Sequence, residues 1–192
     1  MTELANGATI APGVTVTSSE APIQVVKVGP DVNGDADGFV PLDTPLGDDE
    51  PFGEFFLTGD FVDDTDLMLS FATDVVGLSF DIADIDGGGP NNLGNVEMFK
   101  FVAYLDGSDV ETIEVDALDA IAGDAVITQI AFGEDVRLDK LSITGITTRG
   151  TRNIGWGIDN ISATEVPLPA AGWLLIGALG GLAAMKRRKK AA

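Results

Sequence analysis

Short runs in which hydrophobic and polar residues alternate recur along the first 165 residues, between turns rich in Gly, Pro, Asn and Asp. The hydrophobic positions repeat every second residue, and Val, Ile, Thr and Phe are frequent, which is typical of β-strands. The pattern predicts ten strands, at residues 13–17, 23–28, 53–57, 66–71, 75–82, 96–105, 110–115, 125–132, 140–147 and 153–163. Ten short strands predict an all-β fold with a single β-sandwich domain.

The clearest alternation predicts which side chains form the core. Leu78, Phe80 and Ile82 alternate with Ser79 and Asp81, so we expect the first three in the core and the other two in water. The next inward row is expected to comprise Phe99, Phe101, Ala103 and Leu105.

Turn sequences indicate how some strands connect. Residues 106–109, Asp-Gly-Ser-Asp, favour a hairpin between the flanking strands, and residues 148–151 favour a turn before the last strand. Residues 29–51 hold four of the nine prolines and many acidic residues. We expect a long loop there, which is either functional or a loose connection.

The remaining residues form a segment of a different kind. Residues 166–185 carry no charge, and as a helix these 20 residues would be about 30 Å long, enough to cross a bilayer core. Five basic residues follow: Lys186, Arg187, Arg188, Lys189 and Lys190. Such a basic cluster stays on the cytoplasmic side, so the domain of residues 1–165 is expected on the outer side of the membrane.

The start of this segment carries a resemblance to a known family. It reads Val166, Pro167, Leu168, Pro169 and Ala170. With the apolar and basic parts, it resembles the PEP-CTERM sorting signal of Gram-negative bacteria, in its VPLPA variant. The resemblance implies export to the periplasm, a transient transmembrane helix at 171–185, cleavage near the motif by an exosortase, and delivery to the cell surface or exopolysaccharide matrix. An ordinary single-pass anchor is the alternative.

The N-terminus differs from what this family implies. Residues 1–7 have neither the basic nor the apolar region of a signal peptide. We expect that a signal precedes the sequence given. A tail-anchored protein with a cytoplasmic domain is the rival interpretation, and it would require five cations to cross the membrane.

Two segments of the domain carry a weaker resemblance. Residues 77–82, Gly-Leu-Ser-Phe-Asp-Ile, and 157–161, Gly-Ile-Asp-Asn-Ile, resemble the β-sandwich domains that often precede this sorting signal. The resemblance implies a jelly-roll-like module. High β-propensity alone also produces short segments of this kind.

The domain is strongly acidic. The chain has 31 acidic and 11 basic residues, and five of the basic ones lie at 186–190, which leaves six bases and a net charge of −25 elsewhere. Such a surface repels nucleic acids, and six scattered bases form no stripe for phosphate contacts. We therefore expect no nucleic-acid partner. Solubility in salty surroundings accounts for the charge, with cation binding as the alternative.

Calcium is the candidate cation, although the fold needs no cofactor. Oxygen ligands stand at alternate positions, as in a calcium-binding loop, at Asp31, Asn33, Asp35 and Asp37. Neither possible frame of that loop provides both the glycine at position six and the carboxylate at position twelve, so a solvated turn is the alternative. The acidic segments 60–66 and 81–86 offer further ligands, and turn chemistry explains them equally well.

The chain lacks the side chains on which many enzymes depend. It contains no His and no Cys, which excludes Ser-His and Cys-His catalysis and thiolate zinc sites. A carboxylate glycosidase remains a distant alternative, since spacing singles out no acidic pair among so many acids. The sequence therefore predicts a non-catalytic domain.

Aromatic side chains bear on a further alternative, a calcium-dependent carbohydrate-binding module. Such modules stack sugars on exposed aromatic rings. Trp156 shares its strand face with Ile154 and Ile158 and is expected to pack inward. Tyr104 shares its face with Lys100, which makes Tyr104 the candidate glycan contact.

Overall fold

In this computed structural model the described residues are 2–19, 22–28, 38–39, 55–59, 65–85, 96–119, 123–147 and 156–167. Every regular element within them is a β-strand, so the all-β prediction is confirmed. The strands are β1 (Thr2–Leu4), β2 (Ala8–Ala11), β3 (Val14–Thr17), β4 (Ile23–Val28), β5 (Gly38–Phe39), β6 (Phe55–Thr58), β7 (Thr65–Ile85), β8 (Glu97–Leu105), β9 (Ser108–Asp116), β10 (Gly123–Ala131), β11 (Leu138–Thr147) and β12 (Gly157–Glu165). All pairs are antiparallel except β4 with β5.

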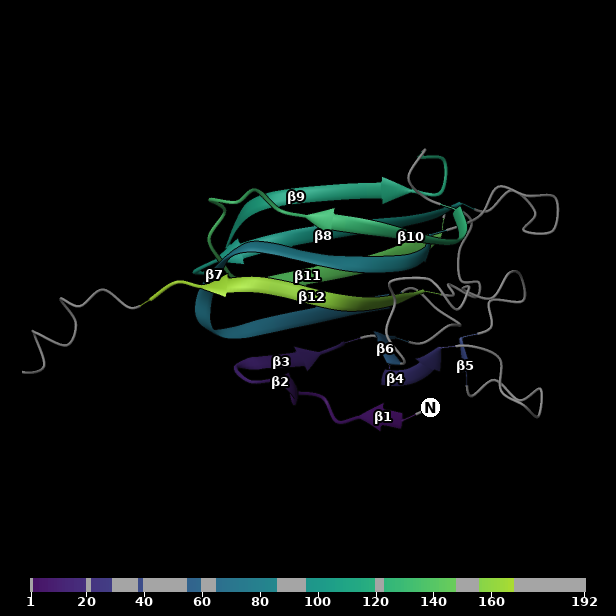
Figure 1. The fold of residues 1–192 in the computed structure, drawn as a ribbon, viewed down its shortest axis with the longest axis horizontal. Coiled ribbons are helices and arrows are strands. Elements are labelled where there is room, and N and C mark those ends of the chain that lie inside the picture. Colours follow the sequence, from purple (N-terminus) through teal and green to yellow (C-terminus); the bar gives the residue numbers. More distant parts are fainter. Residues whose placement is uncertain are drawn as a thin grey trace, which may run out of the picture.

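The longest strand, β7, organises the fold. Its first part, up to Phe71, pairs with β3 and β11, and its second part, from Val75, pairs with β10 and β12. Between these parts the strand curls back on itself (Figure 1). One strand therefore belongs to two layers, a common way to form a corner in packed sheets.

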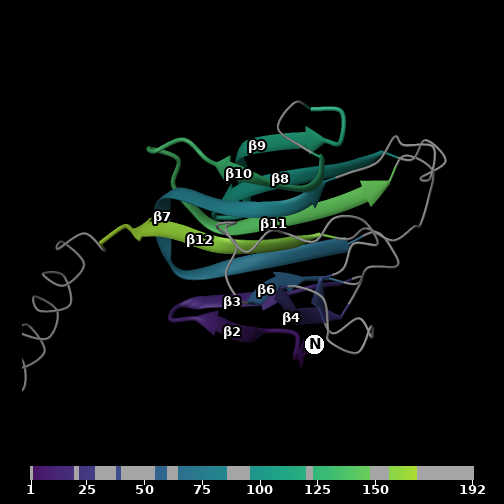
Figure 2. The ribbon, with the colours of Figure 1, turned by 45° about the vertical axis from the view of Figure 1, so that its right-hand side comes forward.

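Each layer follows from these pairings. The first layer has the order β2-β3-β7-β11-β8-β9, and the second has β10-β7-β12-β6-β4, with β1 and β5 beside β4. Figure 2 shows the same arrangement after a turn of the molecule. Together the layers form one large, almost entirely antiparallel sheet, folded over at β7.

The core lies between the layers. The rings of Phe80 on β7 and Phe101 on β8 meet edge to face, with centroids 5.3 Å apart. The ring of Phe99 lies 5.3 Å from that of Trp156, just before β12. Both contacts join the two layers, and such ring pairs add about 0.5–1.5 kcal/mol beyond the gain from burial. The inward positions predicted at Phe80, Phe99 and Phe101 are confirmed, since all three are buried.

One predicted surface residue lies inside. Asp81 was expected in water, and it is buried. Its Oδ2 accepts a hydrogen bond of 2.8 Å from Nδ2 of Asn160, which has a positive φ of 53° on β12. The buried aspartate is tolerated because the neighbouring strand β12 supplies a hydrogen-bond donor. The prediction was wrong because the alternation along β7 carries no information about a donor on another strand.

The predicted strand boundaries differ from the structure at a few places. The segments predicted at 66–71 and 75–82 are one strand, because the pairing continues around the bend. β1 and β2 were not predicted. The hairpin predicted at 106–109 is confirmed, with its turn at Asp106 and Gly107, both at positive φ. The predicted turn at 148–151 lies outside the described residues, as does the loop at 29–51 apart from β5.

Candidate functional site

The chain leaves the folded domain at the bend of β7. β12 ends at Glu165, which pairs with Val75. One residue later, the N–H of Val166 donates a hydrogen bond of 2.8 Å to the carbonyl oxygen of Asp74. Val166 is half-buried and Pro167 is exposed. The first two residues of the predicted sorting motif therefore follow the last strand without a linker.

The rest of the predicted tail lies outside the described residues. This applies to Leu168, Pro169 and Ala170, to the apolar segment 171–185, and to the basic residues 186–190. Among the described segments, no helix is long and apolar enough to cross a membrane. The transmembrane helix at 171–185 therefore stays a prediction.

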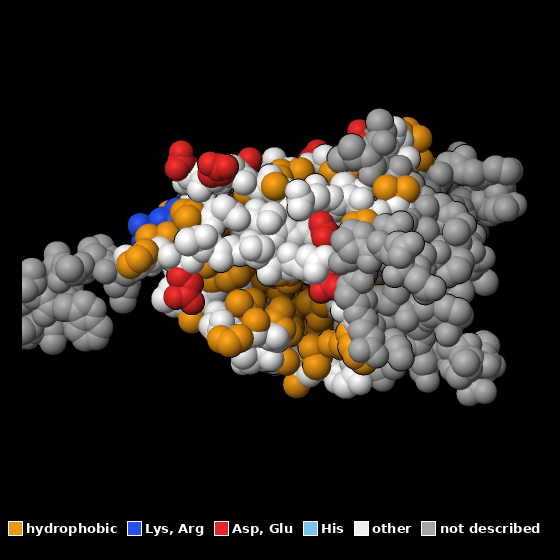
Figure 3. Space-filling model, viewed as in Figure 1, with side chains coloured by type: hydrophobic (Ala, Val, Ile, Leu, Met, Phe, Trp, Pro, Cys, Tyr) orange, Lys and Arg blue, Asp and Glu red, His pale blue; other side chains and the backbone are white. Residues whose placement is uncertain are grey.

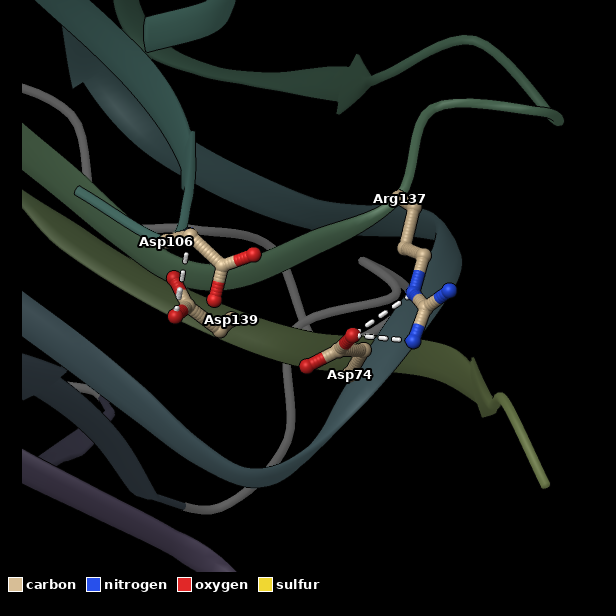
Figure 4. A network of polar contacts seen from close by, with 4 residues as sticks. All are labelled: Asp74, Asp106, Arg137 and Asp139. Atoms are coloured by element: carbon tan, nitrogen blue, oxygen red, sulfur yellow. Dashed lines mark hydrogen bonds and ion pairs between the residues drawn. The ribbon is translucent and has the colours of Figure 1, made fainter. Parts of the chain in front are cut away.

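An ion pair holds the bend where the tail departs. Nε and Nη2 of Arg137, just before β11, lie 2.6 Å and 2.5 Å from Oδ2 of Asp74 (Figure 4). The arginine side chain is 46% exposed and the aspartate side chain 29%. Solvent screens such a pair, so its contribution to stability is at most about 1 kcal/mol. It joins the bend of β7 to the start of β11.

A pair of acidic residues, Asp106 and Asp139, lies close by. The backbone N–H of Asp106 donates a hydrogen bond of 3.3 Å to Oδ2 of Asp139, as Figure 4 shows. The other carboxylate oxygen of Asp139 is shielded from solvent and has no hydrogen-bond partner. In the described part of the chain, no three His, Cys, Asp or Glu side chains gather closely enough to hold a metal.

An apolar groove of about 410 Å³ lies beside the exit of the tail. Its walls come from the β2–β3 hairpin, β4, β6, the bend of β7 and β12. Figure 3 shows hydrophobic side chains gathered in this hollow, beneath β12. The main apolar lining residues are Ile10, Val25, Phe55, Phe71, Val75 and Ile161.

The candidate glycan contact lies on the outward face of the first layer. Tyr104 is half-buried on β8 and is paired across the sheet with Lys140 on β11 and Asp109 on β9. Lys100, four residues before Tyr104 on the same face of β8, is exposed, and its Nζ lies 3.4 Å from Oε1 of Glu114. The outward direction predicted for Tyr104 agrees with this placement, while glycan contact stays a prediction.

Trp156 packs inward, as predicted. Its side chain is 0% exposed and contacts Phe99 in the core. Its indole Nε1 has no hydrogen-bond partner. Trp156 therefore contributes hydrophobic contact and is inaccessible to a sugar ligand.

Only some of the calcium candidates lie within the described residues. Asp31, Asn33, Asp35 and Asp37 lie outside the described residues. In the acidic segment 60–66, Asp66 accepts hydrogen bonds from Oγ of Ser18 and from both N and Oγ of Ser19, at 2.8–3.2 Å. This aspartate thus ties β7 to the end of β3.

Sequence reasoning missed the groove and the ion pair between Asp74 and Arg137. The groove draws its walls from segments far apart in the chain, so no local pattern marks it. Phe55 gave a weak signal, because it precedes Phe56 directly and alternation along a strand puts the two side chains on opposite faces. It is 53% exposed at the groove.

A scan against protein-family models and a search of curated proteins found no match to this chain.

Proposed function

We propose that this protein is exported and reaches the cell surface or an exopolysaccharide matrix, with residues 166–192 as an exosortase sorting tail. Until cleavage, the tail anchors the chain in the inner membrane with the domain in the periplasm. One observation carries the proposal. The last strand ends at Glu165, and the five-residue motif begins at the next residue, with Pro167 exposed.

This junction suits a substrate of a membrane protease. The hydrogen bond from Val166 to Asp74 is the last described contact between the chain and the sheet. Pro167 and Pro169 disfavour helix in the residues before them, which keeps the motif extended between the domain and the predicted span. An extended and accessible backbone is what a protease cleft accepts.

The domain itself is proposed to be a jelly-roll-like β-sandwich with a non-catalytic, structural role. The two layers joined by β7 and the aromatic contacts between them support the sandwich. A domain of this size can bury a core large enough to fold without disulfides.

Mass spectrometry of the protein released from the surface of its native host tests the sorting role. We expect a mature chain that has lost residues 171–192. Recovery of the intact C-terminus on a surface-exposed protein would contradict cleavage and favour a permanent anchor. Protease shaving of whole cells provides the matching test of topology, since the domain should be digested from outside.

A carbohydrate-binding module is the second candidate, favoured by the position of Tyr104. Its ring lies on an outward sheet face beside Lys140, where a sugar could stack and accept hydrogen bonds. Affinity electrophoresis in gels containing the host exopolysaccharide tests this function, with and without calcium. Tyr104→Ala should abolish the retardation and Tyr104→Phe should keep it. If the wild-type protein is not retarded in these gels, carbohydrate binding is excluded and the structural role remains the proposal.

A further inference from the structure

The apolar groove and the departing tail meet at the same end of the domain. Thr73 and Val75 from the bend, and Ala163 and Glu165 from the end of β12, all line the groove. Twenty-five residues, 168–192, follow Pro167. The groove is therefore within immediate reach of the most apolar segment of the chain.

The lining of the groove favours an apolar occupant. Phe55 is 53% exposed there, and Phe71 and Ile10 are only partly buried. Covering apolar surface gains about 25 cal/mol per Å². The volume of about 410 Å³ falls near the lower end of the range for ligand pockets, so the groove suits a few side chains.

The tail offers such side chains after a segment suited to a reversal. Gly172 follows the extended motif 166–170 after a single residue, and glycine favours a turn at that point. Four large apolar residues follow: Trp173, Leu174, Leu175 and Ile176. The six Cα–Cα steps from Pro167 to Trp173 can span up to about 20 Å, enough for the chain to turn back along β12.

We propose that the groove is an intramolecular docking site for residues 173–176 in the precursor before its tail enters the bilayer. This inference rests on the proposed function, because it concerns the same tail. It adds a form of regulation: the groove and the bilayer compete for the same side chains. Docking shields the tail from water, and insertion into the membrane empties the groove.

Disulfide trapping tests the docking directly, because the chain contains no cysteine of its own. The full-length double variant Ala72→Cys/Leu175→Cys places one thiol at the groove, since Ala72 is exposed and lines it. The matched control is Asp135→Cys/Leu175→Cys. Asp135 is exposed, lies outside the groove lining, and precedes Leu138, which pairs with Val75 near the same end of the domain.

In aqueous buffer we expect the monomeric disulfide to form at least about tenfold faster in the groove variant than in the control, because docking raises the local thiol concentration. Equal rates in the two variants would overturn the proposal. Disulfide-linked dimers in place of monomers would also overturn it, since they would assign the groove to a second copy.

Lipid vesicles separate this inference from the proposed function. With phosphatidylethanolamine–phosphatidylglycerol vesicles present, the rate in the groove variant should fall to that of the control, because the tail moves into the bilayer. If trapping in buffer is fast and vesicles leave it unchanged, docking stands and the proposed membrane insertion fails.

A variant of the groove itself provides an independent check. Phe55→Asp, added to the groove pair, puts a charge at an already exposed position and should reduce trapping in buffer to the control rate. Val110→Asp is the matched substitution, since Val110 is 44% exposed on β9 at the edge of the other layer. It should leave trapping unchanged. A loss of trapping with Val110→Asp and none with Phe55→Asp would contradict docking in the groove.

Discussion

Arg137 binds one carboxylate oxygen of Asp74 through two of its nitrogens, while the backbone oxygen of the same aspartate accepts the N–H of Val166. A single residue at the bend of β7 thus contacts both the residue before β11 and the first residue of the proposed sorting motif. The exit of the tail is thereby held by the same corner that joins the two layers.

The ion pair at this corner should contribute little to global stability. Asp74→Asn and Arg137→Gln are each expected to lower the free energy of unfolding by at most about 1 kcal/mol, because both side chains are partly exposed. Urea denaturation of the single and double variants gives the coupling between them, which should shrink in 1 M salt as the charges are screened. A coupling that is insensitive to salt would point to packing as the source.

The Trp156 side chain should contribute to stability through contact alone. Trp156→Ala is expected to cost about 3–5 kcal/mol, because it empties a fully buried site beside Phe99. Trp156→Phe should cost clearly less, since the indole Nε1 has no hydrogen bond to lose. Equal losses for the two substitutions, measured by chemical denaturation, would indicate an unrecognised role for the indole nitrogen.

Asn160 combines a backbone role with a side-chain role, and two substitutions separate them. Asn160→Gly keeps the positive φ of 53° and loses the donor to Asp81. Asn160→Asp loses the donor and brings a second carboxylate to a buried one. We expect the aspartate variant to be the less stable by about 1–3 kcal/mol, measured as a lower midpoint of urea unfolding. The reverse order would mean that repulsion between the two carboxylates contributes little.

Gly157 is required for close packing against Phe56. A Cβ at this position would lie 2.2 Å from the phenylalanine ring, well inside van der Waals contact. Gly157→Ala should therefore destabilise the protein by about 1–3 kcal/mol. Thermal melts should show partial rescue by Phe56→Leu, because the smaller side chain makes room. Additive losses in the double variant would place the strain elsewhere.

The prolines of the motif are predicted to matter for processing rather than for folding. The double variant Pro167→Ala/Pro169→Ala lets helix extend into the motif, so the unprocessed precursor should accumulate in the native host. Leu168→Ile is the matched control and should be processed normally. Immunoblots of membrane and surface fractions measure the ratio, and unchanged processing of the proline variant would exclude the extended motif as the recognition element.

The sequence alone predicted the all-β class, the inward rows on β7 and β8 apart from Leu105, which is half-buried, the hairpin at Asp106 and Gly107, and the burial of Trp156. These features depend on alternation with period two and on turn chemistry, which act between residues close in the chain. The same local information failed at the bend of β7, because a strand that changes partners resembles two strands separated by a turn.

Only the tertiary structure decided which distant residues meet. The pairing of Asp81 with Asn160, the ion pair of Asp74 with Arg137 and the groove beside the tail each join segments separated by many residues. Such contacts follow from strand order and register, and the alternation within each strand is compatible with many orders. The amino-acid pattern thus determined which faces are apolar, and the packing of the two layers determined where an apolar face stays open.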